Sequence, residues 1–283
     1  MTRFVGRRRL VRGAAELLRR YFDHGVARDS AALTYYLLFA LFPLLIFLNN
    51  LVAVLPYDMK GLLRELSTVV PAEVVGFVED YLLYLSATSS RKLLWFSLVF
   101  SVYFPFRSAG ALFASVRKAF GLGQPRSLLR YQLRVLIYTL LLIVALVAGV
   151  AVSVVNRRAL SFASEYIYLS EGFIHMWGSL RFVLLAVLLF AAVTALYALA
   201  QEGPHPARDS WPGVAAALAT WMVMSMLFSF YVERVAQYSL IYGSIGTIIV
   251  LLLWLYLSAT MLIMGAEFNA VLRLGRRGEE DSL

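Results

Sequence analysis

The chain has 283 residues, of which 61% are hydrophobic and 15% are charged, and its mean hydropathy is +0.74. A water-soluble domain carries about 25% charged residues, so this composition excludes a soluble globular fold. The net charge of +9 could indicate a nucleic-acid partner, but the arginines flank apolar segments, where they set topology and attract anionic lipid. No cysteine is present, which excludes disulfides, thiolate metal sites and cysteine nucleophiles.

The N-terminal segment, residues 1 to 28, holds eight arginines. Its apolar residues, among them Leu10, Leu17 and Phe22, recur at helical spacing, and the arginines occupy the remaining arc. This pattern is typical of a basic amphipathic helix at a membrane surface, and a solvated helix is the alternative. The segment has no apolar core of a cleavable signal peptide, so we expect the apolar run that follows it to remain as a membrane anchor.

The first spanning helix is predicted to begin at Asp29, a favourable N-cap residue, and to continue uncharged to Tyr57. Pro43 lies in its interior, where it removes a backbone hydrogen bond and predicts a kink. Asn49 and Asn50 follow near the outer end. Interfacial hydrogen bonding is the simpler interpretation of these two residues, and a contact with a substrate is the alternative.

Residues 58 to 92 are less apolar than the predicted spans on either side of them. From Pro71 the apolar residues recur at offsets of three and four, which predicts an amphipathic helix too polar to span, with a shorter helix over 59 to 69. The second span, 93 to 116, contains Arg107, the one arginine inside an apolar segment. An arginine in hydrocarbon costs at least about 2.5 kcal/mol unless it snorkels or pairs, so Arg107 should face protein or water.

A basic loop over 117 to 134 follows, and three further uncharged runs then each have the length of one crossing. These runs cover 135–156, 182–201 and 211–232. The aromatic residues within 157 to 180 are typical of an amphipathic or re-entrant element at the interface. The last run, 235 to 266, has 32 uncharged residues, whereas about 20 helical residues suffice to cross. We therefore expect Glu267 to emerge at the inner face.

These segments give six spans. If the N-terminus is cytoplasmic, 17 of the 26 Lys and Arg residues lie in inside segments, 8 lie outside, and Arg107 lies within a span. The positive-inside rule therefore predicts that both termini are cytoplasmic. The predicted fold is an all-α membrane protein, with a six-helix domain over 29 to 272, amphipathic outer-face helices, the basic N-terminal helix and a cytoplasmic tail over 273 to 283.

Several short motifs carry a family resemblance. They are AALTYY at 31–36, LFPLL at 41–45, WPGVA at 211–215 with Trp221, YGSIG at 242–246, LLWLY at 252–256 and GAEFN at 265–269. Together they resemble the YihY/BrkB family of bacterial inner-membrane proteins over about residues 28 to 272. The resemblance implies a location in the bacterial inner membrane. Relatives in this family have at times carried a ribonuclease label.

Catalytic and cofactor patterns are not apparent in the sequence. The three histidines, His24, His175 and His205, lie in separate predicted segments, and none has a carboxylate at metal-ligand spacing. No glycine-rich phosphate loop or GxSxG elbow occurs. We therefore expect no enzyme activity, cofactor or metal. The basic loop has few aromatic residues for base stacking, so we also expect no nucleic-acid partner, and a membrane-bound hydrolase or ribonuclease is the least favoured function.

Four polar residues remain at membrane depth: Arg107, Asp29, Glu267 and Asn269. Intramembrane charges commonly mark pathways, so one hypothesis pairs Arg107 with Glu267 or Asp29 beside a cavity that opens to the cytoplasm. A snorkelling arginine and an interfacial carboxylate that only fix helix depth are the alternative. The leading functional prediction is transport or translocation of a hydrophobic or amphiphilic compound, including lipid. A membrane scaffold or regulatory partner is the second, and contact with anionic lipid at the inner face is expected in both.

Overall fold

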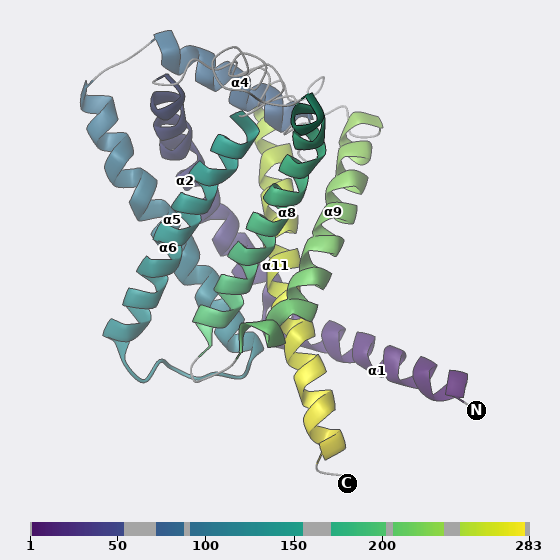
Figure 1. The fold of residues 1–283 in the computed structure, drawn as a ribbon. Coiled ribbons are helices and arrows are strands. Elements are labelled where there is room, and N and C mark those ends of the chain that lie inside the picture. The colour runs from purple at the N-terminus through teal and green to yellow at the C-terminus, as the bar shows by residue number, and fades with distance from the viewer. Residues whose placement is uncertain are drawn as a thin grey trace.

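The structure is a computed structural model that describes residues 2–53, 72–87, 91–154, 171–201, 206–234 and 244–280. Throughout these ranges the regular secondary structure is helical, with no strand, which confirms the predicted all-α class. The long helices stand side by side in a bundle, and both ends of the chain lie at the same end of it (Figure 1).

The helices appear in the following order along the chain. They are α1 (Thr2–Asp23), α2 (Val26–Ala53), α4 (Ala72–Ala87), α5 (Arg91–Ala119), α6 (Leu128–Val154), α8 (Glu171–Ala200), the 3-10 turn η1 (Ala207–Ser210), α9 (Trp211–Arg234) and α11 (Ser244–Glu280). Within the described residues, α6, α8, α9 with η1, and α11 are long and apolar enough to cross a membrane. The helices α2 and α5 cover the other two predicted spans, and the count of six stays a prediction.

Three helix boundaries differ from the prediction. Gly25, at φ +61°, ends α1 and turns the chain, so α2 begins at Val26. Asp29 therefore lies in the first turn of α2 instead of capping the helix. The helix α8 begins at Glu171, so part of the predicted re-entrant element belongs to the fourth span. The helix α11 continues to Glu280, past the predicted start of the tail. The predicted elements over 59–69 and 157–170 lie outside the described residues.

The main core lies in the half of the bundle near the termini. The helix α2 packs along α5, and α11 packs along both α9 and α2. Fully buried side chains from five helices meet there: Leu33, Phe113, Val135, Leu196, Tyr197 and Ile263. A smaller cluster of Val74, Phe228, Val232, Val250 and Leu251 joins α4, α9 and α11 toward the other end.

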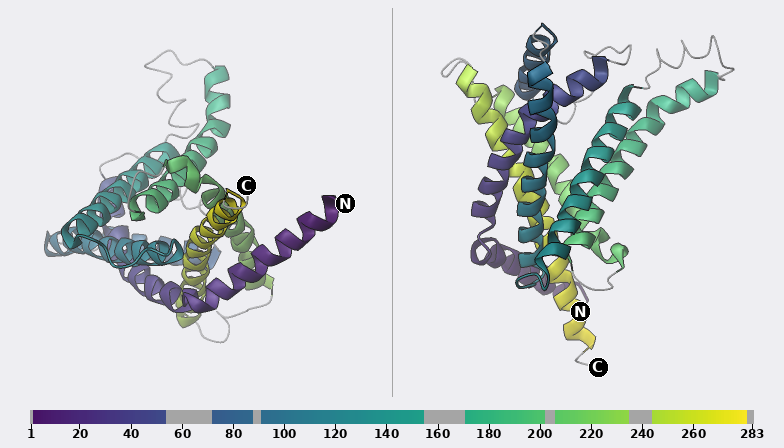
Figure 2. Two further views of the ribbon diagram at one scale, coloured as in Figure 1. Left: turned by 90° about the horizontal axis from the view of Figure 1, so that it is seen from below. Right: turned by 90° about the vertical axis from the view of Figure 1, so that its left-hand side faces the viewer.

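The pair α6–α8 diverges from the rest of the bundle away from the termini (Figure 2, right). Six buried residues of α8 lie between Ala192 and Ala200, whereas none of its residues from 176 to 191 is buried. The pair is therefore held to the other helices through its half near the termini. Its other half presents apolar side chains such as Val144 and Val187 to the surroundings.

The helices α9 and α11 approach most closely at two glycines. A Cβ atom built on Gly213 would lie 2.5 Å from the carbonyl oxygen of Gly265, and one built on Gly265 would lie 2.4 Å from Ala217 Cβ. Tyr197 of α8 reaches the same crossing, where its hydroxyl donates to the carbonyl of Leu262 at 2.5 Å. Small residues allow such close contact between helices in a membrane, where packing holds helices together.

Candidate functional site

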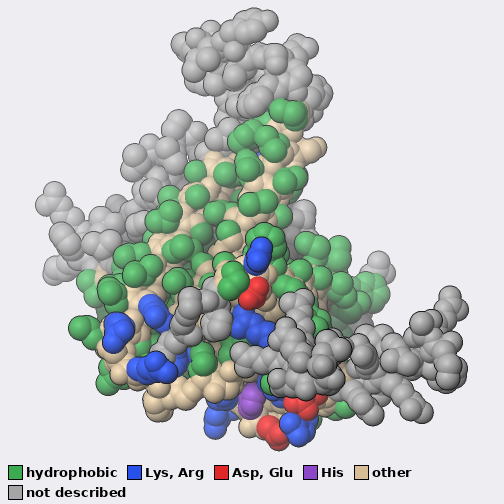
Figure 3. All heavy atoms as spheres, turned by 60° about the horizontal axis from the view of Figure 1, so that its bottom comes forward, with side chains coloured by type: hydrophobic (Ala, Val, Ile, Leu, Met, Phe, Trp, Pro, Cys, Tyr) green, Lys and Arg blue, Asp and Glu red, His purple; other side chains and the backbone are tan. Residues whose placement is uncertain are grey.

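Basic side chains gather at the end of the bundle that carries both termini, which we call the basic end (Figure 3). The helix α1 leaves the bundle here and extends sideways from it. The chain places five basic residues of α1, α5 and α11 at this end: Arg20, His24, Arg117, Lys118 and Arg273. The contacts of these residues define the candidate site.

Glu267 of α11 is the most deeply buried carboxylate at the basic end, with 1% of its side chain exposed. Its oxygens contact α1 and the residue that follows it, since Arg20 Nη1 lies 3.1 Å from Oε2 and His24 Nδ1 lies 2.5 Å from Oε1. Arg20 also donates to the carbonyl of Ala119 at 3.2 Å. A buried carboxylate is stable only when it is paired and hydrogen-bonded, so these contacts fix α1 to α11.

A second ion pair joins α2 to α5 beside the first. Lys118 donates to the carboxylate of Asp29, and Ser115 Oγ donates to the same carboxylate at 3.4 Å. Lys118 also donates to the backbone carbonyl of His24 at 2.8 Å, which joins α5 to the turn between α1 and α2. The two carboxylates therefore hold four helices together at the basic end.

Arginines also occupy the carboxyl ends of helices, where the last carbonyl groups have no partner within the helix. Arg117 donates to the carbonyl of Ala200 at 3.4 Å, and Arg134 donates to that of Gln201 at 3.1 Å, so both meet the end of α8. Cations at this position also oppose the negative end of the helix dipole. Part of the positive charge that the sequence places on this face is therefore structural.

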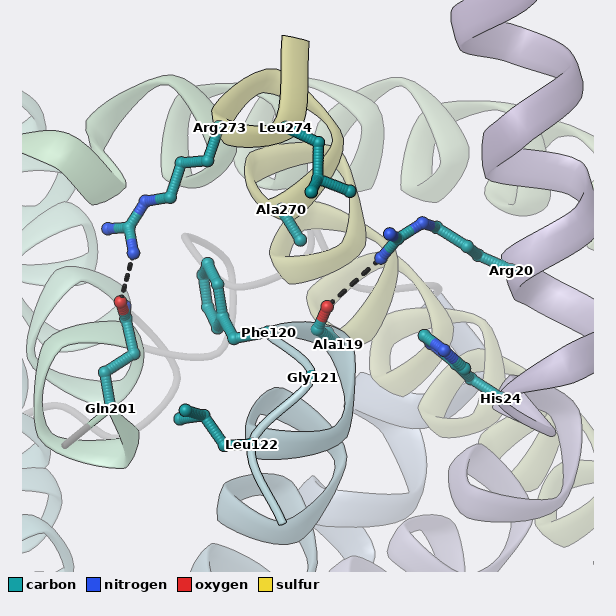
Figure 4. A pocket seen from close by; sticks show the side chains of 10 residues that line it. All are labelled: Arg20, His24, Ala119, Phe120, Gly121, Leu122, Gln201, Ala270, Arg273 and Leu274. Atoms are coloured by element: carbon teal, nitrogen blue, oxygen red, sulfur yellow. Dashed lines mark hydrogen bonds between the residues drawn. The ribbon is translucent and has the colours of Figure 1, made fainter. Parts of the chain in front are cut away.

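A pocket of about 300 Å³ lies among these residues, and we call it the basic pocket (Figure 4). Arg20 and Arg273 lie on opposite sides of it, with Phe120 between them. Arg273 donates to the side-chain oxygen of Gln201 at 2.5 Å, and its guanidinium carbon lies 4.9 Å from the ring centre of Phe120. The remaining lining is small or apolar: Ala119, Gly121, Leu122, Ala270 and Leu274, with His24 at the side of α1.

Arg107 lies away from this cluster. It donates from Nη2 to the hydroxyl of Tyr36 at 3.3 Å, its guanidinium carbon lies 5.5 Å from that ring centre, and the residue is exposed. The predicted ion pair of Arg107 with Glu267 or Asp29 is not formed, because both carboxylates are bonded to other cations. Lys118 lies eleven residues further along α5, three turns on and on the same face, at the level of Asp29.

The other predicted site residues separate into two groups. Asn269 is 1% exposed; its side-chain oxygen accepts from the backbone N–H of Gly213 at 3.3 Å, and its Nδ2 is buried with no hydrogen-bond partner in the described part of the chain. It therefore lies at the crossing of α9 and α11. Asn49 and Asn50 belong to the last turns of α2, and their side chains lie outside the described residues. A pathway role for any of these residues stays a prediction.

Arg20, His24, Gln201 and Arg273 were not singled out by the sequence. The sequence does indicate a partner for Glu267 in the basic N-terminal segment. Glu267 is predicted to emerge at the inner face, where a buried carboxylate needs a nearby cation, and the basic segment lies on that face. That signal does not distinguish Arg20 from the seven other arginines of the segment. Gln201 and Arg273 carry no local pattern that would indicate a pocket.

The hydrogen bond from Arg20 holds the pKa of Glu16, in α1, below its usual value, with smaller contributions from the charges of Arg19 and Arg20. A lowered pKa in the folded state stabilises the protein above the ordinary carboxyl pKa, and this contribution is lost as the pH falls. We expect Glu16→Gln to melt slightly below wild type at pH 7, and the difference to shrink as the pH falls from the ordinary carboxyl pKa through the lowered value of the folded protein. The effect is small because Glu16 is partly exposed. Thermal unfolding at pH 7 and at lower pH checks this, and a difference that grows on acidification would contradict it.

The described residues contain no group of three or more His, Asp or Glu side chains that could hold a metal ion. The polar groups of the basic end instead bind one another. Such bonds hold helices together, and cationic groups of this kind can also bind an anion.

The apolar helices and the basic end together define a polytopic membrane protein. The chain belongs to the family described as Virulence factor BrkB, whose model matches residues 17–283. This confirms the resemblance to the YihY/BrkB family that the sequence motifs predict.

Named relatives fit this assignment. YfkH of Bacillus subtilis (strain 168), whose name describes it as ribonuclease-like, is 32% identical over 257 residues, which cover 91% of this chain and 94% of that protein. A UPF0761 membrane protein of Nitrosospira multiformis is 28% identical over 266 residues, with 90% of this chain and 59% of that protein covered. A UPF0761 membrane protein of Pseudomonas aeruginosa (strain LESB58) is 28% identical over 280 residues, with 94% and 64% covered. The chain thus spans less than two thirds of these two relatives. No solved structure matches.

Proposed function

We propose that the protein binds the anionic head group of an amphiphile in the basic pocket and carries the amphiphile across the bacterial inner membrane. The single observation that carries this proposal is the pocket of about 300 Å³ with Arg20, His24 and Arg273 in its lining, at one end of an apolar helix bundle. Arg273 lines the pocket beside Gln201 and Phe120, where its guanidinium can donate to an anion.

The amphiphilic character of the ligand follows from the surroundings of the pocket. Phe120, Leu122 and Leu274 give the same pocket an apolar wall. Its volume suits a head group, being at the small end of the range for ligand sites, so the hydrocarbon part would lie outside it. The diverging pair α6–α8 offers apolar helix faces along which that part could lie.

In this proposal the basic end faces the cytoplasm, which the excess of basic residues in the inside segments supports. Leu18 and Phe22, one turn apart on α1, are 61% and 70% exposed. An exposed apolar pair on a basic helix supports contact of α1 with anionic lipid at that surface.

The proposed function is binding and movement, without catalysis. Glu267, the one deeply buried carboxylate among the described residues of the basic end, has both oxygens engaged by Arg20 and His24. A general base must reach the proton that it removes, and both oxygens of Glu267 are instead bonded to Arg20 and His24. The polar groups are therefore proposed to bind a head group and to fix α1.

Flux measurements in proteoliposomes test the proposal. The purified protein is reconstituted with fluorescent anionic or zwitterionic lipid, and movement between leaflets is followed by chemical quenching. We expect faster movement of the anionic lipid, and a roughly tenfold loss in Arg273→Ala, which is the effect of removing one charge-assisted hydrogen bond. Arg19→Ala is the matched control, because Arg19 is exposed on α1 and forms its ion pairs with Glu16 and Asp23 of the same helix.

The alternatives give different results in the same experiment. Flux no higher than in empty liposomes would overturn the proposal and favour a scaffold. Equal flux in wild type and Arg273→Ala would overturn the assignment of the basic pocket.

A further inference from the structure

Arg107 presents a positive charge on the membrane-facing side of α2 and α5. It is exposed, although it belongs to an apolar segment, and its hydrogen-bond partner is the neutral hydroxyl of Tyr36. The carboxylates Asp29 and Glu267 are held at the basic end by other residues. Arg107 therefore has a charge that no carboxylate in the described part of the chain neutralises.

The depth of Arg107 makes this charge costly. Twelve residues separate it from the end of α5 at Ala119, and ten separate Tyr36 from the start of α2 at Val26. At about 1.5 Å per residue, the pair lies roughly 15 to 18 Å from the basic end, within a hydrocarbon core of about 30 Å. A charge at this depth costs at least about 2.5 kcal/mol unless an anion or water meets it.

An apolar groove of about 480 Å³ lies between α5 and α6, along the stretch of α5 that precedes Arg107. Its lining includes Val102, Tyr103 and Phe106 of α5 and Leu129, Leu133 and Leu136 of α6. Phe106 is the neighbour of Arg107 in sequence. Tyr103 lies one turn before Arg107 on α5, so the lining of the groove reaches the turn of the helix that carries the charge. A cation at the edge of an apolar groove matches a ligand with one anionic and one hydrocarbon part.

We propose that Arg107 binds the phosphate of a membrane phospholipid and that the groove between α5 and α6 takes one of its acyl chains. The planar guanidinium can donate two parallel hydrogen bonds to a phosphate, and the hydroxyl of Tyr36 stands next to it. Snorkelling of the Arg107 side chain toward the interface and local thinning of the bilayer shorten the distance between the guanidinium and the phosphate. This lipid would be bound whether or not the protein transports anything.

A second copy of the chain is the other occupant to consider, and the residues around Arg107 disfavour it. The exposed large side chains of these parts of α2 and α5, among them Tyr35, Phe39 and Tyr103, carry no negative charge. A symmetrical contact through this face would bring two Arg107 side chains together without a carboxylate between them. A phosphate supplies the missing negative charge.

Native mass spectrometry of the protein released from nanodiscs of mixed phosphatidylglycerol and phosphatidylcholine tests this inference. We expect wild type to retain one phosphatidylglycerol that Arg107→Leu loses, with roughly tenfold weaker binding. Leu133→Trp fills the groove without changing the charge and should lose the same lipid. Arg126→Leu removes one exposed cation from the basic loop and is the matched control, which should bind as wild type does.

Equal lipid retention in wild type and Arg107→Leu would overturn the proposal. A lipid-free dimer that dissociates in Arg107→Leu would overturn it as well and assign the face to a second copy. If Arg107→Leu does not fold, Leu133→Trp decides, because retention of the lipid in a filled groove contradicts the proposed chain site.

Discussion

Gly265→Ala is expected to unfold at a clearly lower temperature than wild type, because the crossing of α9 and α11 has no room for a methyl group. A Cβ atom at position 265 would lie 2.4 Å from Ala217 Cβ, 2.6 Å from the hydroxyl of Tyr197 and 2.8 Å from the carbonyl oxygen of Gly213. Two of these groups belong to the packed helix α9, so relief requires that the helices move apart. Overpacking of this kind costs about 1–3 kcal/mol, which corresponds to roughly 5 °C in a protein of this size.

Gly149→Ala is the matched control. A Cβ atom there would meet Leu185 and Leu188 of α8 at 3.8 and 3.7 Å, which is ordinary van der Waals contact. Alanine also favours a helix by about 1 kcal/mol over glycine, so this variant should melt at or above the wild-type temperature. Thermal unfolding of both variants in the same detergent gives the comparison. Equal melting temperatures for the two variants would show that the crossing is looser than the structure places it.

Local hydropathy was sufficient to predict the helices. The uncharged runs over 135–156, 182–201 and 211–232 correspond to α6, α8 and α9, because a chain in hydrocarbon must satisfy its backbone groups within each segment. The same argument located α11. Boundaries were less predictable where one residue decides them, as Gly25 does between α1 and α2.

Partner choice at the basic end could not be predicted in the same way. Glu267 bonds to Arg20 and His24, which are 247 and 243 positions away in the chain, and no local pattern encodes such a contact. The prediction for Arg107 used the correct principle, that an intramembrane charge needs a partner. It failed on depth, since Lys118, three turns further along α5, lies level with Asp29 and takes that carboxylate.

Glu267→Ala is expected to release α1 from the bundle and to lower stability by about 3 kcal/mol. Removing one partner from a buried ion pair costs about 3–5 kcal/mol, and the lower value applies because Arg20 and His24 keep 14% and 27% of their side chains exposed. The variant should melt at a lower temperature and be cut more readily by protease near Gly25, where α1 joins α2. Glu16→Gln, which changes a partly exposed carboxylate on the same helix, should leave the rate of cleavage close to wild type.

A double-mutant cycle separates this anchoring role from other effects of the substitution. If Glu267 holds α1 through Arg20, the double variant Arg20→Ala/Glu267→Ala should lose less stability than the sum of the two single losses, because in Glu267→Ala the Arg20 side chain has already lost this bond and keeps only those to Glu16 and to the carbonyl of Ala119. Fully additive losses would mean that the two residues act independently and would contradict the anchor. The flux assay then distinguishes an anchoring role of Glu267 from a role in the transport pathway. If Glu267→Ala frees α1 and still moves anionic lipid at the wild-type rate, Glu267 is an anchoring residue. If Glu267→Ala loses flux while α1 stays protected from protease, Glu267 belongs to the pathway.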